Sequence, residues 1–199
     1  MKKYIIMIMC VILTMFTGCG KTNNIGKLNV DTIIRRDVEA KIVAYDNLSD
    51  MEKSSDAIIK VIKSDKECPV ISRYGKEFVS GFTFSYVIVK EIYKDNTESI
   101  INGDVIRILE NEVYDEQFET VYHIAGYEKM VEGCEYILLV EKNTYTDGDT
   151  YYTPLGVHYG VVSLEDDGRY VDVTQKHSSR FNMALFEAIW DEIRQRYND

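Results

Sequence analysis

The segment 82–93 (FTFSYVIVKEIY) is the clearest strand in this sequence and constrains the fold most strongly. Successive side chains of a strand point to opposite faces of a sheet, so the segment is predicted to present two different faces. One face carries aromatic and apolar residues and the other carries smaller residues. The two sets are Phe82, Phe84, Tyr86 and Ile88, and Thr83, Ser85, Val87 and Val89.

Further segments have strand character. After the segment 57–63 we expect a loop that contains Pro69 and Gly75. Asn102-Gly103 is typical of a type I′ turn, in which both central residues have positive φ, and it leads into a strand at 105–109. An extended segment or first strand is expected to end near Val43. The remaining strands are predicted at 135–142, 151–152, 156–164 and 170–173.

Two helices are predicted beside these strands. A capping-box pattern that starts at Ser49 predicts a short helix to about Ser55. Ser178 or Ser179 is expected to cap a closing C-terminal helix at 180–196. Its apolar residues fall on one broad arc at 100° per residue: Leu185, Phe186, Ile189, Trp190, Ile193 and Tyr197. Five or more short strands with this helix predict a mainly β (α+β) fold, a small antiparallel barrel or sandwich.

The charge of the chain excludes some partners. The 199 residues have a formal net charge of −10. Lys2 and Lys3 are the only charged residues before Cys19, so 21 basic and 33 acidic residues remain from Cys19 onward, a net charge of −12. An acidic body argues against nucleic acid as a partner and against a polybasic membrane patch.

The amino-terminal segment has the composition of a signal peptide. Lys2 and Lys3 precede an uncharged apolar stretch at 4–16. As a helix this stretch would rise only about 20 Å, short of the roughly 30 Å hydrocarbon core of a membrane. A signal-peptide core therefore fits better than a permanent span, although an uncut anchor helix is the alternative.

The residues Phe16-Thr17-Gly18-Cys19 resemble the lipobox of bacterial lipoproteins. The resemblance implies that Cys19 receives a diacylglycerol thioether and that signal peptidase II cuts between Gly18 and Cys19. Two or three acyl chains would anchor the protein stably. We therefore expect a signal peptide at 1–18, a flexible tether at 19–27 and one β-rich domain at 28–199, held by its acyl chains on the extracytoplasmic face of the cell membrane.

A second resemblance covers roughly residues 57–173. The succession TFSYVIVKEIYKD, INGDVIRILENE, GYEKMVEGCEYILLVEKN and YYTPLGVHYGVVSL is similar to a class of uncharacterised secreted or lipid-anchored bacterial proteins. In strand order it resembles the oligonucleotide/oligosaccharide-binding (OB) type of barrel. The resemblance implies an OB-like fold and brings no catalytic residues, and this fold serves many functions.

Only two of the four cysteines belong to the predicted domain. In an exported domain, Cys68 and Cys134 are able to form one disulfide. The alternative is two separate thiols, each acting as a small apolar residue.

The candidate binding residues are aromatic. The cluster Tyr145, Tyr151, Tyr152 and Tyr159 is a candidate platform for a sugar, a peptide or a protein partner, or else a set of half-buried strand tyrosines. The three histidines and the cysteines lack metal-ligand spacing, so no metal and no cofactor are predicted. Acidic turns at 147–149 and 165–168 are typical turn formers rather than calcium loops.

No catalytic set stands out among these residues. The chain lacks a GxSxG elbow and a phosphate-binding glycine loop, and nothing selects a carboxylate pair. We therefore predict a non-catalytic binding domain whose partner is an envelope protein, a peptide or a glycan. A cell-envelope hydrolase and an inhibitor of an envelope enzyme are the alternatives.

Overall fold

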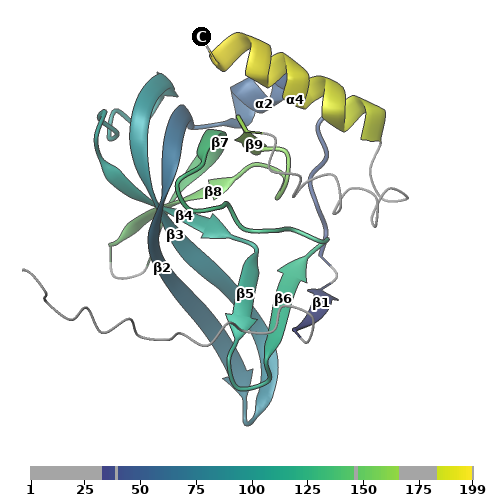
Figure 1. The fold of residues 1–199 in the computed structure, drawn as a ribbon. Helices are drawn as coiled ribbons and strands as arrows, with labels where there is room; N and C mark the ends of the chain where they lie inside the picture. The colour runs from purple at the N-terminus through teal and green to yellow at the C-terminus, as the bar shows by residue number, and fades with distance from the viewer. Residues whose placement is uncertain (1–32, 39, 146–147, 166–182, 199) are drawn as a thin grey trace, which may run out of the picture. The chain divides into compact units, whose positions relative to one another are not determined.

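The alternating segment forms the middle of β3 (Glu77–Asp95), the longest strand. The computed structural model describes residues 33–198 except 39, 146–147 and 166–182 (Figure 1). Within β3, Thr83, Ser85 and Val87 are buried, whereas Ile88 is 37% exposed. The predicted alternation is confirmed, and the smaller residues face the interior.

Several predictions lie outside the described residues. These are the signal peptide, lipid attachment at Cys19, the tether, the strand at 170–173 and the helix cap at Ser178 or Ser179. The described residues belong to a unit that begins at Ile33. Its main hydrophobic core is contributed by side chains from Leu48 to Ile193, so this unit has a core of its own.

Five strands close into a ring. The larger sheet has the order β2-β3-β4-β8-β7-β9, and β2 also pairs with β7. The β4–β8 pairing is parallel and the other pairings are antiparallel. The mainly β prediction is therefore confirmed. The bounds are β2 (Ala57–Tyr74), β4 (Val105–Glu110), β7 (Glu135–Thr144), β8 (Thr150–Pro154) and β9 (Val161–Ser163).

A second sheet of three strands has the order β1-β6-β5. Its strands are β1 (Ile34–Val38), β5 (Glu112–Asp115) and β6 (Thr120–Ile124). The extended segment predicted to end near Val43 is thus a strand of five residues. The hairpin of β5 and β6 was not predicted from the sequence, because its strands are short and mix charged with apolar residues.

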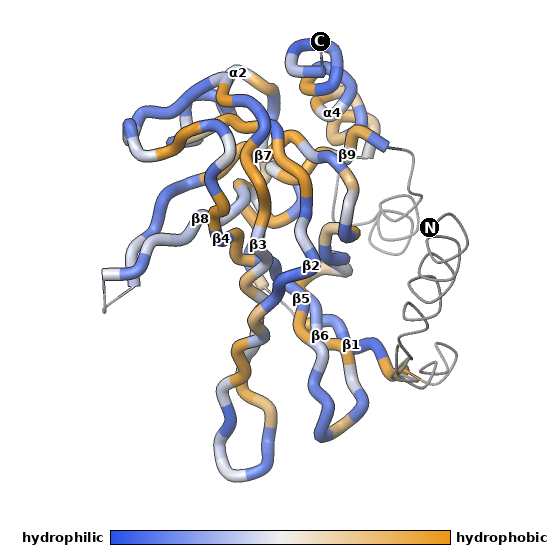
Figure 2. Tube along the Cα trace, turned by 60° about the vertical axis from the view of Figure 1, so that its left-hand side comes forward, coloured by the Kyte–Doolittle hydropathy of each residue, from blue (hydrophilic) through white to orange (hydrophobic). Residues whose placement is uncertain are grey.

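The strands β2 and β3 form one long hairpin that runs beyond the ring. Their register continues to Tyr74 and Glu77, and Figure 2 shows a hydrophilic tip below a hydrophobic stretch. The prediction of a loop after the segment 57–63 is therefore wrong, because β2 continues to Tyr74 and only the short turn to Glu77 is not strand. Pro69 is tolerated because β2 pairs with β7 only as far as Ile62, which leaves its other edge unpaired within the described residues.

A helix cap and a turn differ from the prediction in detail. The short helix α2 (Leu48–Ser54) is capped by Asn47, whose side chain accepts a hydrogen bond from the Asp50 amide, rather than by Ser49. At Asn102-Gly103 only Gly103 has a positive φ, of 92°. A single positive φ, at the third residue of the turn, is the signature of a type II turn rather than type I′.

The C-terminal helix α4 (Met183–Tyr197) packs on the ring beside α2, near β7 and β9 (Figure 1). The predicted arc is confirmed, because Phe186, Ile189, Trp190 and Ile193 are at most 5% exposed. Each such side chain contributes roughly 1.5–3 kcal/mol by burial. At the last turn, Arg196 and the Tyr197 hydroxyl both bond the Glu52 carboxylate of α2 at 2.5 Å.

No helix among the described residues has the length and apolar character needed to cross a membrane.

Candidate functional site

The outer face of β3 and β4 combines aromatic and basic side chains. The antiparallel register places Tyr86 opposite Arg107, with Phe84 on the same side of β3. The neighbouring pair, Ser85 and Ile108, is fully buried. Because side chains alternate along a strand, Phe84, Tyr86 and Arg107 lie on the outer face of the ring.

Three aromatic rings meet on this face, and we call them the aromatic cluster. The ring centroids are 5.3 Å apart for Phe84 and Tyr151, 5.9 Å for Phe84 and Tyr145, and 5.4 Å for Tyr145 and Tyr151. Such tilted and edge-on contacts are favourable for aromatic pairs. Phe84 is 5% exposed and Tyr145 is 38% exposed, so a buried ring supports one that faces solvent.

Arg107 joins the aromatic cluster to the β7–β8 hairpin. Its guanidinium carbon lies 5.3 Å from the centre of the Phe84 ring. The Nε and Nη2 groups donate hydrogen bonds to the Thr150 carbonyl at 3.2 and 3.1 Å, and Nη2 lies 3.0 Å from an oxygen of Asp149. These contacts hold the guanidinium in one place, with its charge at the rim of the cluster.

A pocket of about 470 Å³ is lined by Arg107, which also contacts the Phe84 ring of the aromatic cluster, and we call it the β3–β4 pocket. The Lys142 ammonium donates to the Ser99 hydroxyl at 2.9 Å, and this hydroxyl lies 3.2 Å from that of Tyr152. The wall therefore offers two cations, a carboxylate and several hydroxyl groups. Its lining is Tyr86, Ser99, Val105, Ile106, Arg107, Lys142, Asp149, Thr150 and Tyr152.

Asp95 positions Ser99 at the edge of this pocket. Its carboxylate accepts hydrogen bonds from the amides of Thr97, Ser99 and Ile100, each at 2.9 Å, and from the Thr97 hydroxyl at 2.7 Å. Burial alone would raise the pKa of this carboxyl, but the hydrogen bonds outweigh it and lower the pKa. The loop between β3 and β4 is thus fixed by one anion.

The structure brings together two of the four tyrosines predicted as a platform. Tyr145 and Tyr151 belong to the aromatic cluster. Tyr152 lines the neighbouring pocket but is 3% exposed, and Tyr159 is 2% exposed. The Tyr159 ring packs 4.9 Å from that of Phe186, inside the core. A single platform of four tyrosines is therefore wrong, because strand alternation sends Tyr152 inward and the core encloses Tyr159.

The two cysteines are not bridged. Cys68 is an exposed free thiol on β2, opposite Phe84. The carbonyl of Cys134 accepts a hydrogen bond from the Lys63 amide, and Lys63 lies opposite Val87. Phe84 and Val87, the β3 residues opposite Cys68 and Lys63, are three residues apart. At the rise of a strand this places the two cysteines about 10 Å apart along the sheet. That separation exceeds the Cα distance that a disulfide spans.

Two buried glutamates lie where the ring meets the second sheet. Glu110 is fully buried and accepts hydrogen bonds from the Ser85 hydroxyl at 3.1 Å and the Met130 amide at 3.0 Å. Burial raises the pKa of Glu110 and that of Glu112 to about 7. Neither side chain lines the β3–β4 pocket, so these carboxyls belong to the interior rather than to the candidate site.

The polar side chains of the β3–β4 pocket were not predicted from the sequence. Ser99 and Lys142 lie in different segments, and only the closed ring brings them within hydrogen-bond distance. Arg107 had a usable signal, since it is the single charged residue inside the apolar run 105–109.

Among the described residues, no group of three or more histidine, cysteine or acidic side chains is arranged to hold a metal ion. No family model matches this chain, and no curated protein matches it either.

Proposed function

We propose that this protein is a non-catalytic, lipid-anchored binding protein of the extracytoplasmic face, whose ligand is a glycan of the cell envelope. The observation that carries the binding function is the adjacency of the aromatic cluster and the β3–β4 pocket on one outer face. An exposed ring of Tyr145 lies there beside a wall of hydroxyl, ammonium and carboxylate groups.

A glycan fits this chemistry for two reasons. The apolar face of a sugar ring packs on an aromatic ring, and its hydroxyl groups both donate and accept hydrogen bonds. Lys142 supplies a donor and Asp149 an acceptor, while Ser99 supplies either. Ligand sites of this kind combine aromatic surface with a few placed polar groups.

The anchor is supported by the sequence. The lipobox-like residues 16–19 follow an apolar stretch too short to span a membrane, and Cys19 is the residue that would carry the acyl chains. The tether of 19–27 would leave the domain free to reach an insoluble polymer beside the membrane.

The anchor is tested by Cys19→Ala, with fractionation of cells and acyl labelling. The proposal expects wild-type protein in the membrane fraction with acyl label, and variant protein without label and released from the membrane. Membrane retention of the unlabelled variant would mean that the apolar segment alone anchors the chain.

Binding is tested with the soluble chain, residues 19–199 with Cys19→Ser, by co-sedimentation with isolated insoluble envelope polysaccharide. Tyr145→Ala should weaken binding about threefold to tenfold, the usual worth of an aromatic contact, and Tyr145→Phe should retain most of it. Tyr74→Ala is the matched control, because Tyr74 is 82% exposed on the distant hairpin tip. Equal binding by all four proteins would refute a glycan site on this face.

A second candidate is an inhibitor of an envelope enzyme. The observation that favours it is the long hairpin, whose turn at Gly75 follows the exposed Tyr74 and precedes Val79, which is 57% exposed. Such a projecting tip is able to enter an enzyme cleft. For an inhibitor, Tyr74→Ala would abolish inhibition of the target hydrolase while Tyr145→Ala would not, the reverse of the pattern expected for the glycan.

A further inference from the structure

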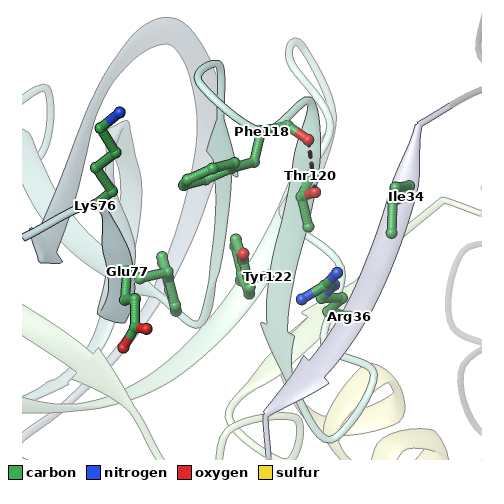
Figure 3. A pocket seen from close by; sticks show the side chains of 8 residues that line it. Ile34, Arg36, Lys76, Glu77, Phe118, Thr120 and Tyr122 are labelled. Carbon is green, nitrogen blue, oxygen red and sulfur yellow. Dashed lines mark hydrogen bonds between the residues drawn. The ribbon is translucent and has the colours of Figure 1, made fainter.

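A second pocket, of about 640 Å³, lies between the tip of the β2–β3 hairpin, the β5–β6 turn and β1. We call it the hairpin-tip pocket. Figure 3 shows Lys76 and Glu77 on one side, Phe118 above, Tyr122 in the centre, and Ile34 and Arg36 on the other side. None of its lining residues lines the β3–β4 pocket. The lining is Ile34, Arg36, Lys76, Glu77, Phe78, Phe118, Thr120 and Tyr122.

The floor of the hairpin-tip pocket is aromatic. The rings of Phe78 and Tyr122 stack in parallel, with centroids 3.6 Å apart and planes 3° apart. This contact joins β3 to β6 and gives the pocket an aromatic surface from two sheets. A flat apolar group is able to pack against an edge or an open face of this ring pair.

Phe118 is held over this floor by a structured turn. The buried Asp115 carboxylate accepts hydrogen bonds from Arg73 at 2.6 Å and from the Gln117 amide at 3.0 Å. The Thr120 hydroxyl donates to the Phe118 carbonyl at 2.8 Å (Figure 3). Phe118 nevertheless remains 41% exposed. Its ring is therefore placed by the fold while one side stays open to a ligand.

The charges around the pocket are unequal. Arg35 and Arg36 are neighbours on β1, so their side chains point to opposite faces of the sheet. The Arg35 guanidinium forms ion pairs with the carboxylates of Glu112 and Glu128, at 3.7 and 3.4 Å. Arg36 has no ion pair among the described residues, and its guanidinium extends from β1 towards Tyr122 (Figure 3). Lys76 adds a second cation at the rim and Glu77 one opposing anion. The pocket thus has a net positive charge within an acidic protein.

We propose that the hairpin-tip pocket binds a small anion with a flat apolar body, such as an aromatic or polycyclic carboxylate, sulfonate or phosphate ester. The anionic group pairs with Arg36, whose planar guanidinium suits two-pronged contact with an oxyanion. The flat body packs between Phe118 and the stacked rings. This site is separate from the proposed glycan site and has its own ligand class.

The test uses a matched pair of dyes with the soluble chain. Anilinonaphthalene sulfonate carries both the flat body and the anion, and phenylnaphthylamine is its uncharged analogue. Fluorescence titration should give tighter binding for the sulfonate. Arg36→Gln should weaken sulfonate binding by about fivefold, the worth of a partly exposed ion pair, and leave the uncharged dye unchanged.

Further variants separate this pocket from other dye sites. Glu77→Gln should strengthen sulfonate binding by about twofold and Lys76→Gln should weaken it by about twofold, while Phe118→Ala should weaken both dyes. Arg107→Gln, on the glycan face, should change neither, so the two proposals fail independently. Sulfonate binding that is unchanged by both Arg36→Gln and Phe118→Ala, or that is absent in the wild type, would overturn the proposal.

Discussion

At the scale of single residues, the interior of this protein includes several buried charged side chains. Lys63 is 2% exposed, and its ammonium donates to the Ser64 carbonyl at 2.7 Å and lies 3.1 Å from Glu67. Burial opposes ionisation of Glu67, but bonds from Lys129 and Lys63 lower its pKa. Among the described residues, Glu110 has the Ser85 hydroxyl and the Met130 amide as direct partners, and its burial outweighs them. Its pKa is therefore raised while that of Glu67 is lowered.

Glu110→Gln should stabilise the protein in mild alkali. The pKa of Glu110 is raised from 4.5 to about 7 on folding, so the folded state binds more protons than the unfolded state between these values. The free energy of unfolding therefore falls as the pH rises towards about 7, and the penalty is complete above it. At about pH 8 the variant should be more stable by about 1–3 kcal/mol.

Urea unfolding at two pH values measures this effect. At about pH 4.5 and below, near the unfolded pKa, the difference between Glu110→Gln and wild type should largely vanish. Glu132→Gln, at an exposed position, is the control and should change little at either pH. A loss of stability in Glu110→Gln at about pH 8 would contradict a raised pKa for the buried Glu110.

At the scale of elements, α4 covers one end of the ring through a few large side chains. The Phe186 ring lies 4.5 Å from Trp190 and 4.9 Å from Tyr159. The sequence predicted this helix well because its apolar residues recur at helical spacing. The unpredicted continuation of β2 through Pro69 depends on the missing neighbour at its edge, which no local pattern reveals.

Trp190→Ala should remove this cover. Deleting a buried tryptophan leaves a cavity, and the cost is about 3–5 kcal/mol of the free energy of unfolding. Glu187→Ala, on the exposed side of the same helix, should cost less than about 0.5 kcal/mol. Thermal unfolding of both variants gives the comparison, and similar midpoints would mean that α4 contributes little to the core.

Gly81→Ala should destabilise the long hairpin. A Cβ added at Gly81 would lie 2.6 Å from Cγ1 of Val113 and 3.1 Å from the Val70 carbonyl oxygen, so β5 packs on β3 only because this residue lacks a side chain. We expect a cost of about 1–3 kcal/mol. The double variant Gly81→Ala, Val113→Ala should cost less than the sum of the two single changes. Additive costs would argue against this contact.

At the scale of the whole molecule, the sequence predicted the mainly β fold and the closing helix. The strands 82–93, 105–109 and 135–142 were recognisable because their apolar patterns are local. The second sheet escaped prediction because β1 and β6, far apart in the chain, are short and pair in parallel. Both pockets are likewise assembled from distant segments, so their polar linings emerge only from the closed fold.

The two proposed sites should act independently. Arg36 lies on β1 and Arg107 on β4, in different sheets. The two pockets that they line have no lining residue in common. Additivity is the rule for distant sites without common partners. In the double variant Arg36→Gln, Arg107→Gln, each ligand should bind as it does to the corresponding single variant. A double variant that differs from both would indicate coupling through the fold.

The most direct test of the central claim is a hydrogen–deuterium exchange footprint of the soluble chain with a soluble envelope oligosaccharide. We predict slower exchange at Tyr145, at Gly148–Thr150 and along β4, with no change at the hairpin tip around Gly75. Protection confined to the hairpin tip, or no protection at any of these positions under saturating oligosaccharide, would contradict a glycan-binding face on β3, β4 and β8.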